Sequence, residues 1–471
     1  MQILSSTFIA LPLVAAILLW GPRTGILILF GLLPMGMMAA FNLPAIGGTT
    51  ILASDLAVLA LLALLFLRPG GFDLLARVFS PGSPGLSLLA FFGYAVIATM
   101  FLPRIFEGAT EVFSLSRSAN EDGIVANPLR PGTGNLSQLL RMTLGISVFT
   151  AAVAFAIRYR DPKLALRAVQ VASVVHIGMG LLDILTNGAG MPWLLDWART
   201  GNYALTLGQK MAGFNRMIGG FPEASSYGYF SLGLLGFWTS YWLSGRDRTA
   251  APTIFFVLTL FVVLRGTSSS AYVGAALLAM VFLMMSALDT RRTGLSVRAA
   301  AIGIGVSVLI PILCVTVVIL YQTAPTFTNF VDQSLLNKLD SESGLERASW
   351  NMQALRNFLD TNLLGAGLGS VRASNWVVAV LATTGLPGMI LMFAFLWRLF
   401  TFSQPGTDPE AKRIELALKM ACVGFLARAV VVKASPSLDY GFFAAAGLAT
   451  GLVAAQFPLR QRKPHAAEAP L

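Results

Sequence analysis

Charged side chains are scarce in this sequence. Asp, Glu, Lys and Arg make up 12% of its 471 residues, whereas an ordinary soluble domain carries about 25%. Long stretches have no charge at all, among them residues 4–21, 24–50 and 299–321. A run of about 20 apolar residues can cross the hydrocarbon core of a bilayer as a helix. With 56% hydrophobic residues, the chain is predicted to be an all-α protein that is embedded in the lipid bilayer.

Cysteine and histidine are almost absent, since the chain has two of each. Cys314 and Cys422 both fall in apolar stretches, which excludes a disulfide framework. His176 and His465 form no cluster with them, so a zinc or haem site is not expected. We predict no metal and no other cofactor, and we expect His176 to pack between helices.

The chain is basic, with a formal net charge of +11, but it has no nucleic-acid-binding motif and no interleaving of basic and aromatic residues. Lys and Arg accumulate in the cytoplasmic loops of membrane proteins, where they also meet anionic lipid. The positive charge is therefore interpreted as a sign of which loops face the cytoplasm, and nucleic acid is not expected as a partner.

The apolar stretches predict about 13 transmembrane helices, or roughly 12–14. The first stretch lacks a cleavage site and is expected to remain as a membrane helix. Residues 1–457 would form a single membrane domain and residues 458–471 a short cytoplasmic tail. The predicted spans are 4–20, 24–44, 50–67, 85–102, 138–158, 164–186, 223–244, 252–265, 268–288, 299–321, 375–399, 413–433 and 437–456.

Basic residues in the short loops predict the orientation of these spans. With the C-terminus in the cytoplasm, the alternate loops that face the same side carry most of the Lys and Arg, for example Arg68 with Arg77 and Arg158 with Lys163. Long polar loops at about 103–137, 187–222 and 322–374 then lie outside. Functional residues often lie on such loops because a rigid scaffold positions them.

The second long loop ends in a group of residues suited to an anionic ligand. It reads Lys210-Met-Ala-Gly-Phe-Asn-Arg216-Met-Ile-Gly-Gly-Phe-Pro-Glu223. An arginine such as Arg216 can hold a phosphate by forked hydrogen bonds, although a solvated arginine at the head groups would give the same pattern. Glu223 begins the next helix, where it can complement the helix dipole or act as a general base.

The third long loop contains a predicted amphipathic helix lying at the membrane surface. Arg347 projects about 120° away from its apolar stripe, so it faces either a cavity or simply the solvent. The stripe recurs at helical spacing and consists of Leu345, Ala348, Met352, Leu355 and Leu359.

A glycine run follows in residues 363–375, where Gly365, Gly367 and Gly369 precede Arg372. Alternating glycines permit positive φ angles and close backbone approach. Together with Arg372 and a helix start they suggest a backbone cradle for an anion. A tight re-entry into the next helix is the alternative, and an ATP-type phosphate loop is excluded because no Lys-Ser/Thr pair follows.

Two further arginines lie at apolar segments. Arg265 precedes a serine-rich turn at an outer helix end, and Arg428 lies inside a predicted span. An intramembrane arginine is costly unless it faces water or a partner, which makes Arg428 a functional candidate unless it reaches the outer face. Asp439 and Tyr440 follow in the last outer turn, and Asp439 is predicted as the partner of Arg428.

These residues carry a resemblance to a known family. An ordered set of motifs across about residues 200–400 resembles the O-antigen polymerase and O-antigen ligase superfamily, which includes Wzy-type and ExoQ-like exopolysaccharide polymerases. The motifs are Arg216-x-x-Gly-Gly-Phe-Pro-Glu223-Ala-Ser, Thr267-Ser-Ser-Ser-Ala-Tyr-Val-Gly274, Arg347-x-x-Trp350 followed by Leu364-Gly-Ala-Gly-Leu-Gly369-Ser, and Ala382-Thr-Thr-Gly385-Leu-Pro-Gly388.

The resemblance implies a GT-C-like glycosyltransferase of the bacterial inner membrane that needs no metal and whose site faces the periplasm. It would transfer a growing glycan between undecaprenyl-pyrophosphate-linked oligosaccharides in exopolysaccharide, capsule or O-antigen synthesis, with a chain-length-regulating copolymerase as a further partner. Arg216 and Arg347 match arginines implied to bind pyrophosphate or glycan, and Glu223 joins them as a catalytic candidate. The predicted substrate-binding residues are Arg265, Arg372, Arg428, Lys210, Asp439 and Tyr440.

Departures from the family pattern bear on the reaction. The ligase branch places a histidine soon after the glycine motif, whereas Val371-Arg-Ala-Ser-Asn375 stands here, which favours a polymerase over a ligase. The arginine expected after the serine-rich turn is also missing, with Arg265 as its potential replacement. A transporter of lipid-linked sugars is a third interpretation, but the sequence has no internal repeat and its long loops lie on one side only.

Overall fold

A computed structural model describes residues 2–43, 49–115, 124–203, 205–206, 208–211, 214–244, 250–293, 319–334, 342–403 and 408–456. Over these residues the protein is mostly helical. The helices are α1 (Thr7–Trp20), α2 (Pro22–Leu32), α3 (Ala53–Leu67), α4 (Gly71–Val78), α5 (Pro84–Ile105), α6 (Thr133–Tyr159), α7 (Pro162–Gly188), α8 (Ala224–Leu243), α9 (Ala250–Arg265), α10 (Ser269–Thr293), α12 (Pro325–Ser334), α13 (Glu342–Asp360), α14 (Trp376–Thr401), α15 (Pro409–Val431) and α16 (Asp439–Ala454), with a 3-10 helix, η2, at Pro192–Ala198. The strands form three antiparallel hairpins, which pair β1 (Ala39–Leu43) with β2 (Thr49–Leu52), β3 (Glu111–Leu115) with β4 (Ile124–Pro128), and β5 (Lys210–Met211) with β6 (Phe214–Asn215).

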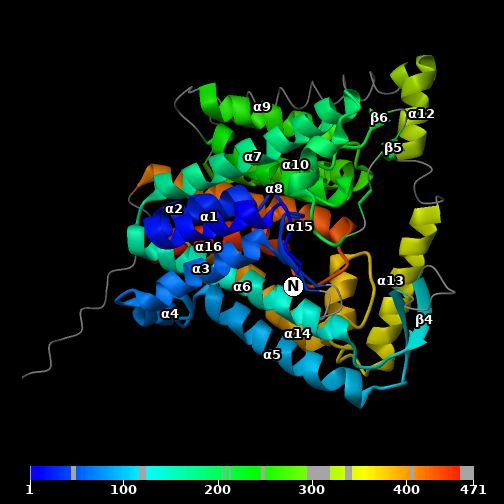
Figure 1. Ribbon diagram of the computed structural model, residues 1–471, viewed down its shortest axis with the longest axis horizontal. Helices are drawn as coiled ribbons and strands as arrows, with labels where there is room; N and C mark the ends of the chain where they lie inside the picture. The colour runs from blue at the N-terminus through cyan, green and yellow to red at the C-terminus, as the bar shows by residue number, and fades with distance from the viewer. Residues whose placement is uncertain are drawn as a thin grey trace, which may run out of the picture.

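Most of the helices run side by side in one bundle (Figure 1). At its core α16 packs on α6 and α15, and α15 packs on α8. Every residue of α16 from Phe442 to Ala454 is buried. Small residues make this packing possible, because a Cβ at Gly447 would lie 2.7 Å from the Phe149 carbonyl oxygen. Close helix contacts through small residues are typical of packing inside membranes.

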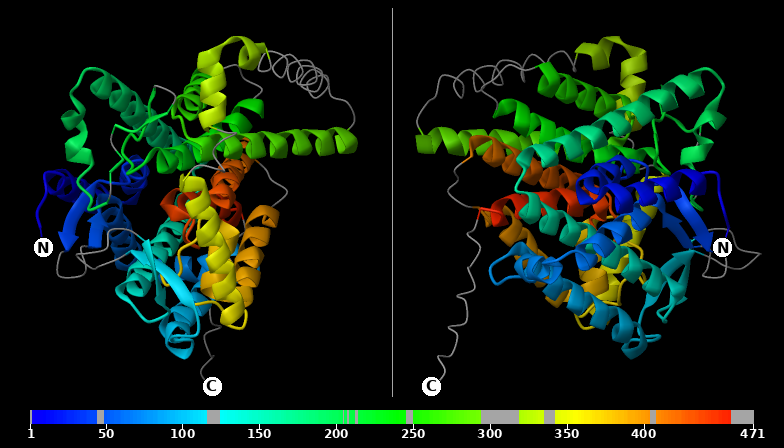
Figure 2. Two further views of the ribbon diagram at one scale, coloured as in Figure 1. Left: turned by 90° about the vertical axis from the view of Figure 1, so that its right-hand side faces the viewer. Right: turned by 60° about the vertical axis from the view of Figure 1, so that its left-hand side comes forward.

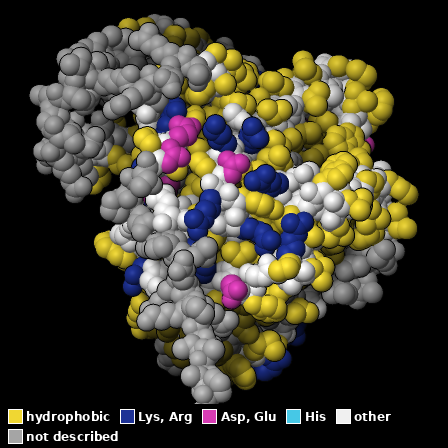
Figure 3. Space-filling model, turned by 90° about the vertical axis from the view of Figure 1, so that its left-hand side faces the viewer, with side chains coloured by type: hydrophobic (Ala, Val, Ile, Leu, Met, Phe, Trp, Pro, Cys, Tyr) yellow, Lys and Arg dark blue, Asp and Glu magenta, His cyan; other side chains and the backbone are white. Residues whose placement is uncertain are grey.

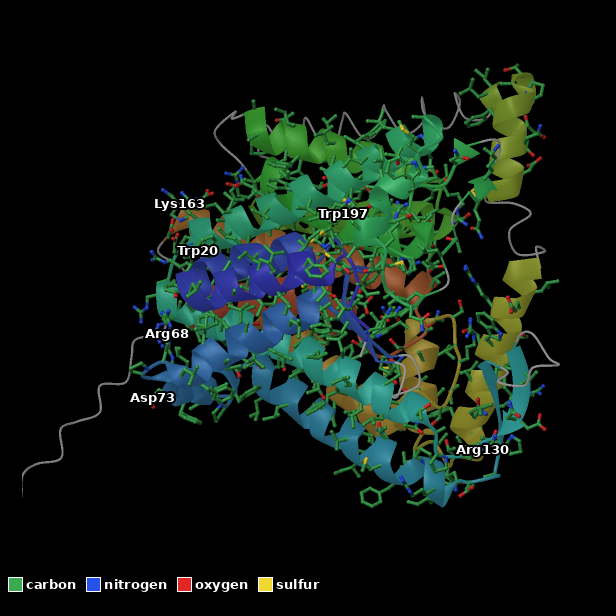
Figure 4. The ribbon with its side chains drawn as sticks, in the orientation of Figure 1. Trp20, Arg68, Asp73, Arg130, Lys163 and Trp197 are labelled. Carbon is green, nitrogen blue, oxygen red and sulfur yellow. The ribbon has the colours of Figure 1, made fainter. Side chains whose placement is uncertain are left out.

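Three helices begin with a capping side chain followed by proline. Ser83, Asp161 and Asp408 are the N-caps of α5, α7 and α15, and each accepts a hydrogen bond from a backbone N–H of the first turn. A cap satisfies N–H groups that a helix start leaves free, and proline has none to satisfy. These starts lie at the end of the molecule that carries Arg68 and Lys163 (Figure 4).

The elements of the three long loops gather at the opposite end. The β3–β4 and β5–β6 hairpins, α12 and α13 lie there, and the left view of Figure 2 looks onto them. The predicted amphipathic helix is α13, which runs across the bundle end (Figure 1). Its apolar stripe faces outward, with Leu345 61% and Leu359 63% exposed, whereas Ala354 and Asn357 are buried. Because Arg347 stands two turns before Ala354, it shares the inner face.

Several helices have the character of membrane spans. Four described helices, α5, α6, α7 and α14, are long and apolar enough to cross a bilayer, and the pair α3–α4, bent by 115°, meets the same criterion together. Shorter apolar helices are α1, α2, α9, the first part of α10, and α16. The predicted helical class is confirmed, whereas the number of about 13 spans goes beyond this count and stays a prediction.

The predicted span over residues 24–44 is wrong in its second half. The helix α2 ends at Leu32, and Ala39–Leu43 form the strand β1 instead. Pro34 stands two residues after the end of α2 and has no backbone N–H with which to continue the helix. Apolar composition alone does not distinguish a buried strand from a buried helix, so the sequence could not predict this hairpin.

A helix lies at each of the other predicted spans within the described residues, including the separate α9 and α10 on either side of the turn after Arg265. Most of the span predicted at 299–321, and the tail at 458–471, lie outside the described residues. His176 packs between helices as predicted. Its ring is fully buried, stacks on Tyr227 with 4.1 Å between ring centres, and shares a 2.7 Å hydrogen bond with the Ser231 hydroxyl.

Candidate functional site

A cavity of about 410 Å³ is bordered by residues of the second long loop, among them Tyr203, Phe221 and Pro222. Its walls come from the starts of α3, α8 and α16, the first turns of α6, the end of α15 and the segment that follows it. A cavity of this volume falls in the range of small-ligand sites. Its polar side chains include Glu223, Ser226, Arg428, Lys433, Asp439, Tyr440, Gln138, Arg141 and Tyr203.

Glu223 is the N-cap residue of α8 and lines the cavity. Its Oε1 accepts hydrogen bonds from the hydroxyls of Ser225 and Ser226, the latter at 3.3 Å. None of the salt bridges among the described residues includes this carboxylate. Both interpretations of Glu223, as a dipole partner and as a base, are therefore compatible with its position.

The loop that precedes α8 is held by a buried ion pair. Asp183, near the end of α7, contacts Arg199, and both side chains are 1% exposed. The Oδ2 of Asp183 accepts hydrogen bonds from the N–H groups of Ile218, at 2.8 Å, and Gly219, at 3.1 Å. Arg199 donates from Nε and Nη2 to the Gly219 carbonyl, at 2.9 and 2.7 Å. Because Asp183 already occupies this pair of backbone donors, the turn positions its neighbours rather than binding a ligand.

Arg428 has an unused hydrogen-bond donor. The residue lines the cavity from the last turn of α15 and is only 4% exposed. Its Nη1 donates to the Val432 carbonyl, and its guanidinium carbon lies 5.7 Å from the centre of the Tyr229 ring. Its Nε is buried without a hydrogen-bond partner. Because buried donors are rarely unsatisfied, this N–H is a candidate to bind an anionic ligand.

Two arginines, Arg216 and Arg428, interact electrostatically with Glu223, and a third, Arg347 on α13, interacts with both of them. Burial lowers the pKa of the Arg216 guanidinium, Glu223 opposes this shift, and Arg347 adds to it. The Nη1 of Arg216 donates to the Gln209 amide oxygen at 3.0 Å, but its Nε has no partner. The group therefore has an excess of positive charge.

Asp439 does not pair with Arg428, so that prediction is wrong. It contacts Lys433 instead, in the segment between α15 and α16, and the Lys433 ammonium lies 5.0 Å from the centre of the Tyr229 ring. Lys433 lies in the connection that leads to Asp439, the first residue of α16. Among the described residues, no carboxylate lies within 4 Å of the Arg428 guanidinium.

Tyr440 belongs to a network at the cavity wall that we did not predict. Its hydroxyl donates to Asp55 Oδ1 at 2.7 Å, and Asp55 Oδ2 lies 3.5 Å from Arg141 Nη1. Arg141 Nη2 also donates to the Thr50 carbonyl, at 3.0 Å, and to the Tyr203 hydroxyl. Burial raises the pKa of the Tyr203 hydroxyl, and Arg141 opposes this shift. The carboxylate of Asp55, which is 2% exposed, is thus held by Arg141 and Tyr440.

The first part of the glycine run does not form an anion cradle, because its backbone donors are used within the protein. The N–H groups of three consecutive residues are bonded at 2.8–3.1 Å, from Gly365, Ala366 and Gly367 to Thr361 Oγ1 and the carbonyls of Ala382 and Thr383. The two carbonyls belong to α14 just before its break at Gly385, where φ is 63°. The tight re-entry into the next helix is therefore the correct alternative, and the third and fourth family-like motifs pack against each other.

Of the predicted site residues, Glu223, Arg428, Asp439 and Tyr440 line the cavity, whereas Arg216, Arg347, Lys210, Arg265 and Arg372 are not part of its described lining. Lys210 is an exposed residue of β5. Arg265 Nη1 donates to the Asn215 carbonyl at 3.1 Å and so supports the strand before Arg216. Arg372 stacks on Trp350, with 4.1 Å from its guanidinium carbon to the ring centre, and burial lowers its pKa.

Comparison with known proteins gives no assignment, since neither a family model nor a curated protein matches the chain.

Proposed function

We propose that the protein is a polysaccharide polymerase that joins undecaprenyl-pyrophosphate-linked oligosaccharide repeat units in this cavity. The observation that carries the proposal is that Glu223 and Arg428 line a cavity of about 410 Å³, with Arg216 in electrostatic range of Glu223 and Arg347 in range of both arginines. Guanidinium groups suit a pyrophosphate because they form charge-assisted, forked hydrogen bonds. Arg428 lines the cavity, and the Nε atoms of Arg216 and Arg428 have no hydrogen-bond partner within the protein.

In this proposal Arg428 and Arg216 hold the pyrophosphate of the donor, and Arg347 stabilises the negative charge that grows on it. Glu223 accepts the proton of an acceptor sugar hydroxyl while that oxygen attacks the anomeric carbon of the donor glycan. The bond from this carbon to the pyrophosphate oxygen breaks, and the lipid pyrophosphate leaves with the electron pair. Fixed positive charge beside the leaving group lowers the barrier to this step.

The proposed orientation places the cavity in the periplasm. Lys and Arg side chains gather at the opposite end of the bundle (Figure 3), and basic ends of membrane proteins favour the cytoplasm. The same proposal includes a GT-C-like fold with about 13 spans and a location in the bacterial inner membrane. It also includes a cytoplasmic C-terminus and a chain-length-regulating copolymerase as partner.

A size analysis of products in proteoliposomes tests the function. Purified protein receives a synthetic undecaprenyl-pyrophosphate oligosaccharide, and wild type is expected to produce a ladder of longer lipid-linked glycans. Arg428→Gln and Glu223→Gln should each lower the rate about 100-fold or more, as lost charge stabilisation or acid–base catalysis does. Arg130→Gln, an exposed arginine at the same end (Figure 4), should keep the ladder.

Other outcomes contradict the polymerase. Transfer of the glycan only to an acceptor without lipid pyrophosphate would indicate a ligase. Movement of the intact substrate across the bilayer, with no ladder, would indicate a transporter.

A further inference from the structure

We infer that the cavity has a second subsite, formed by Gln138, Arg141, Tyr203 and Tyr440, which binds sugar hydroxyls of the glycan and not the pyrophosphate. The inference rests on the proposed function, which supplies the glycan. All four side chains line the cavity. They come from α6, the segment after η2, and the start of α16, whereas Arg428 and Glu223 belong to α15 and the start of α8.

Arg141 and Arg428 differ in whether their charge is compensated. Arg141 Nη1 lies 3.5 Å from a carboxylate oxygen of Asp55, which Tyr440 and the Leu52 N–H also hold, at 2.7 and 2.9 Å. Arg428 has no described carboxylate within 4 Å and an unpartnered Nε, and Glu223 and Asp439 act on it only from a longer distance. An anion beside Arg141 would lie close to the buried Asp55 charge, and like charges repel most strongly where water is excluded. The pyrophosphate therefore belongs at Arg428.

The groups that remain at the Arg141 wall match the surface of a sugar ring. The side chain of Arg141 is 26% exposed, and both N–H groups of its Nη2 are used, by the Thr50 carbonyl and Tyr203. These bonds hold the guanidinium in place, and the donors that it can offer a ligand are on Nη1 and Nε. Gln138, one helical turn earlier on α6, offers both a donor and an acceptor. The rings of Tyr203 and Tyr440 add flat apolar faces next to polar groups. Neutral hydroxyls on a ring with apolar faces are thus the ligand this wall fits.

Because both subsites line one cavity, a glycan held at the Arg141 wall stays beside Glu223. The wall would then select the sugar, while the arginines recognise the part common to all lipid-linked donors. Substitutions at the two subsites should consequently affect different parts of the ligand.

Binding measurements with two split ligands test this assignment. Wild type and variants in nanodiscs are titrated calorimetrically with farnesyl pyrophosphate, which carries no sugar. They are also titrated with the free oligosaccharide released by mild acid from the lipid-linked glycans of the cells that produce this protein. Gln138→Ala and Tyr203→Phe each remove hydrogen-bonding groups and should weaken oligosaccharide binding about tenfold, with farnesyl pyrophosphate binding unchanged within about twofold. Arg428→Gln should do the reverse.

Neither test variant removes a member of the Asp55–Arg141 ion pair, so both should fold, and thermal unfolding confirms this before titration. If wild type binds both ligands but Gln138→Ala and Tyr203→Phe leave oligosaccharide affinity unchanged, or weaken both ligands equally, the sugar subsite is wrong and the proposed function stands. If wild type binds neither ligand, the proposed function fails and the subsite with it.

Discussion

At the residue scale, the unused N–H of Arg428 distinguishes this side chain from the paired Arg141 and Lys433. Arg428→Lys keeps a positive charge but removes Nε and the planar fork, so it is not a conservative change at a forked site. We expect Arg428→Lys to weaken farnesyl pyrophosphate binding about tenfold or more, measured by calorimetry in nanodiscs. Unchanged affinity would mean that charge alone, and not the fork, matters at this position.

Asp183 is predicted to act through stability and loop position. Asp183→Asn leaves Arg199, whose side chain is 1% exposed, without a counter-charge, and breaking a buried ion pair costs about 3–5 kcal/mol. The unfolding temperature in detergent should therefore fall clearly. The double variant with Arg199→Gln should recover part of the loss, because no charge remains unpaired. A double variant less stable than Asp183→Asn would contradict this interpretation.

Sequence reasoning found the residues that carry a local signal but not those that depend on long-range contacts. Arg216, Glu223 and Arg347 stand in motifs, and Arg428 stands out as a charge inside an apolar segment. The bond from Tyr440 to Asp55 joins residues 385 positions apart, which no spacing reveals. The rule that flagged Arg428, that charges inside spans are functional candidates, applies equally to Asp55, and would have found it.

At the scale of elements, the break in α14 makes a prediction about packing. Gly385 has φ 63°, and a Cβ there would lie 2.3 Å from the Leu363 carbonyl oxygen. Gly385→Ala should separate the glycine run from α14 and destabilise the protein by more than the roughly 1–2 kcal/mol of left-handed strain alone. Thermal unfolding in detergent measures this effect.

Gly93→Ala is the matched control, because Gly93 lies exposed in the middle of α5 and an added Cβ meets nothing within 4 Å. Alanine is the better helix former by roughly 0.5–1 kcal/mol, so this variant should be as stable as wild type or slightly more. Equal losses at both positions would show that the break in α14 is not specifically packed.

Regular elements were predictable where their pattern was periodic. The exposed stripe of α13 and the helices at the predicted spans follow from 3.6-residue periodicity and apolar length. The strand Ala39–Leu43 did not, because apolar composition fits a buried strand and a buried helix equally well. The contact of the glycine run with Gly385 did not either, because it forms only when the loop packs on α14. The cavity was beyond prediction for the same reason, since its walls meet only in the folded bundle.

At the scale of the whole molecule, the two ends of the bundle should lie on opposite sides of the membrane. Cysteine labelling tests this after Cys314 and Cys422 are replaced. With Arg130→Cys at the cavity end, an impermeant maleimide should react in intact spheroplasts. With Lys163→Cys at the basic end (Figure 4), it should react only after permeabilisation. The reverse pattern would place the cavity in the cytoplasm and contradict the proposed orientation.

The central claim is that the cavity holds a lipid-linked pyrophosphate at its arginines. The most direct measurement is an experimental structure of the protein with a non-cleavable methylene-diphosphonate analogue of the lipid-linked oligosaccharide. Both phosphonate groups should lie in the cavity, hydrogen-bonded to Arg428 and Arg216, with the glycan extending past Glu223 toward Arg141. A ligand bound elsewhere in the bundle, with no contact to Arg428, would contradict it.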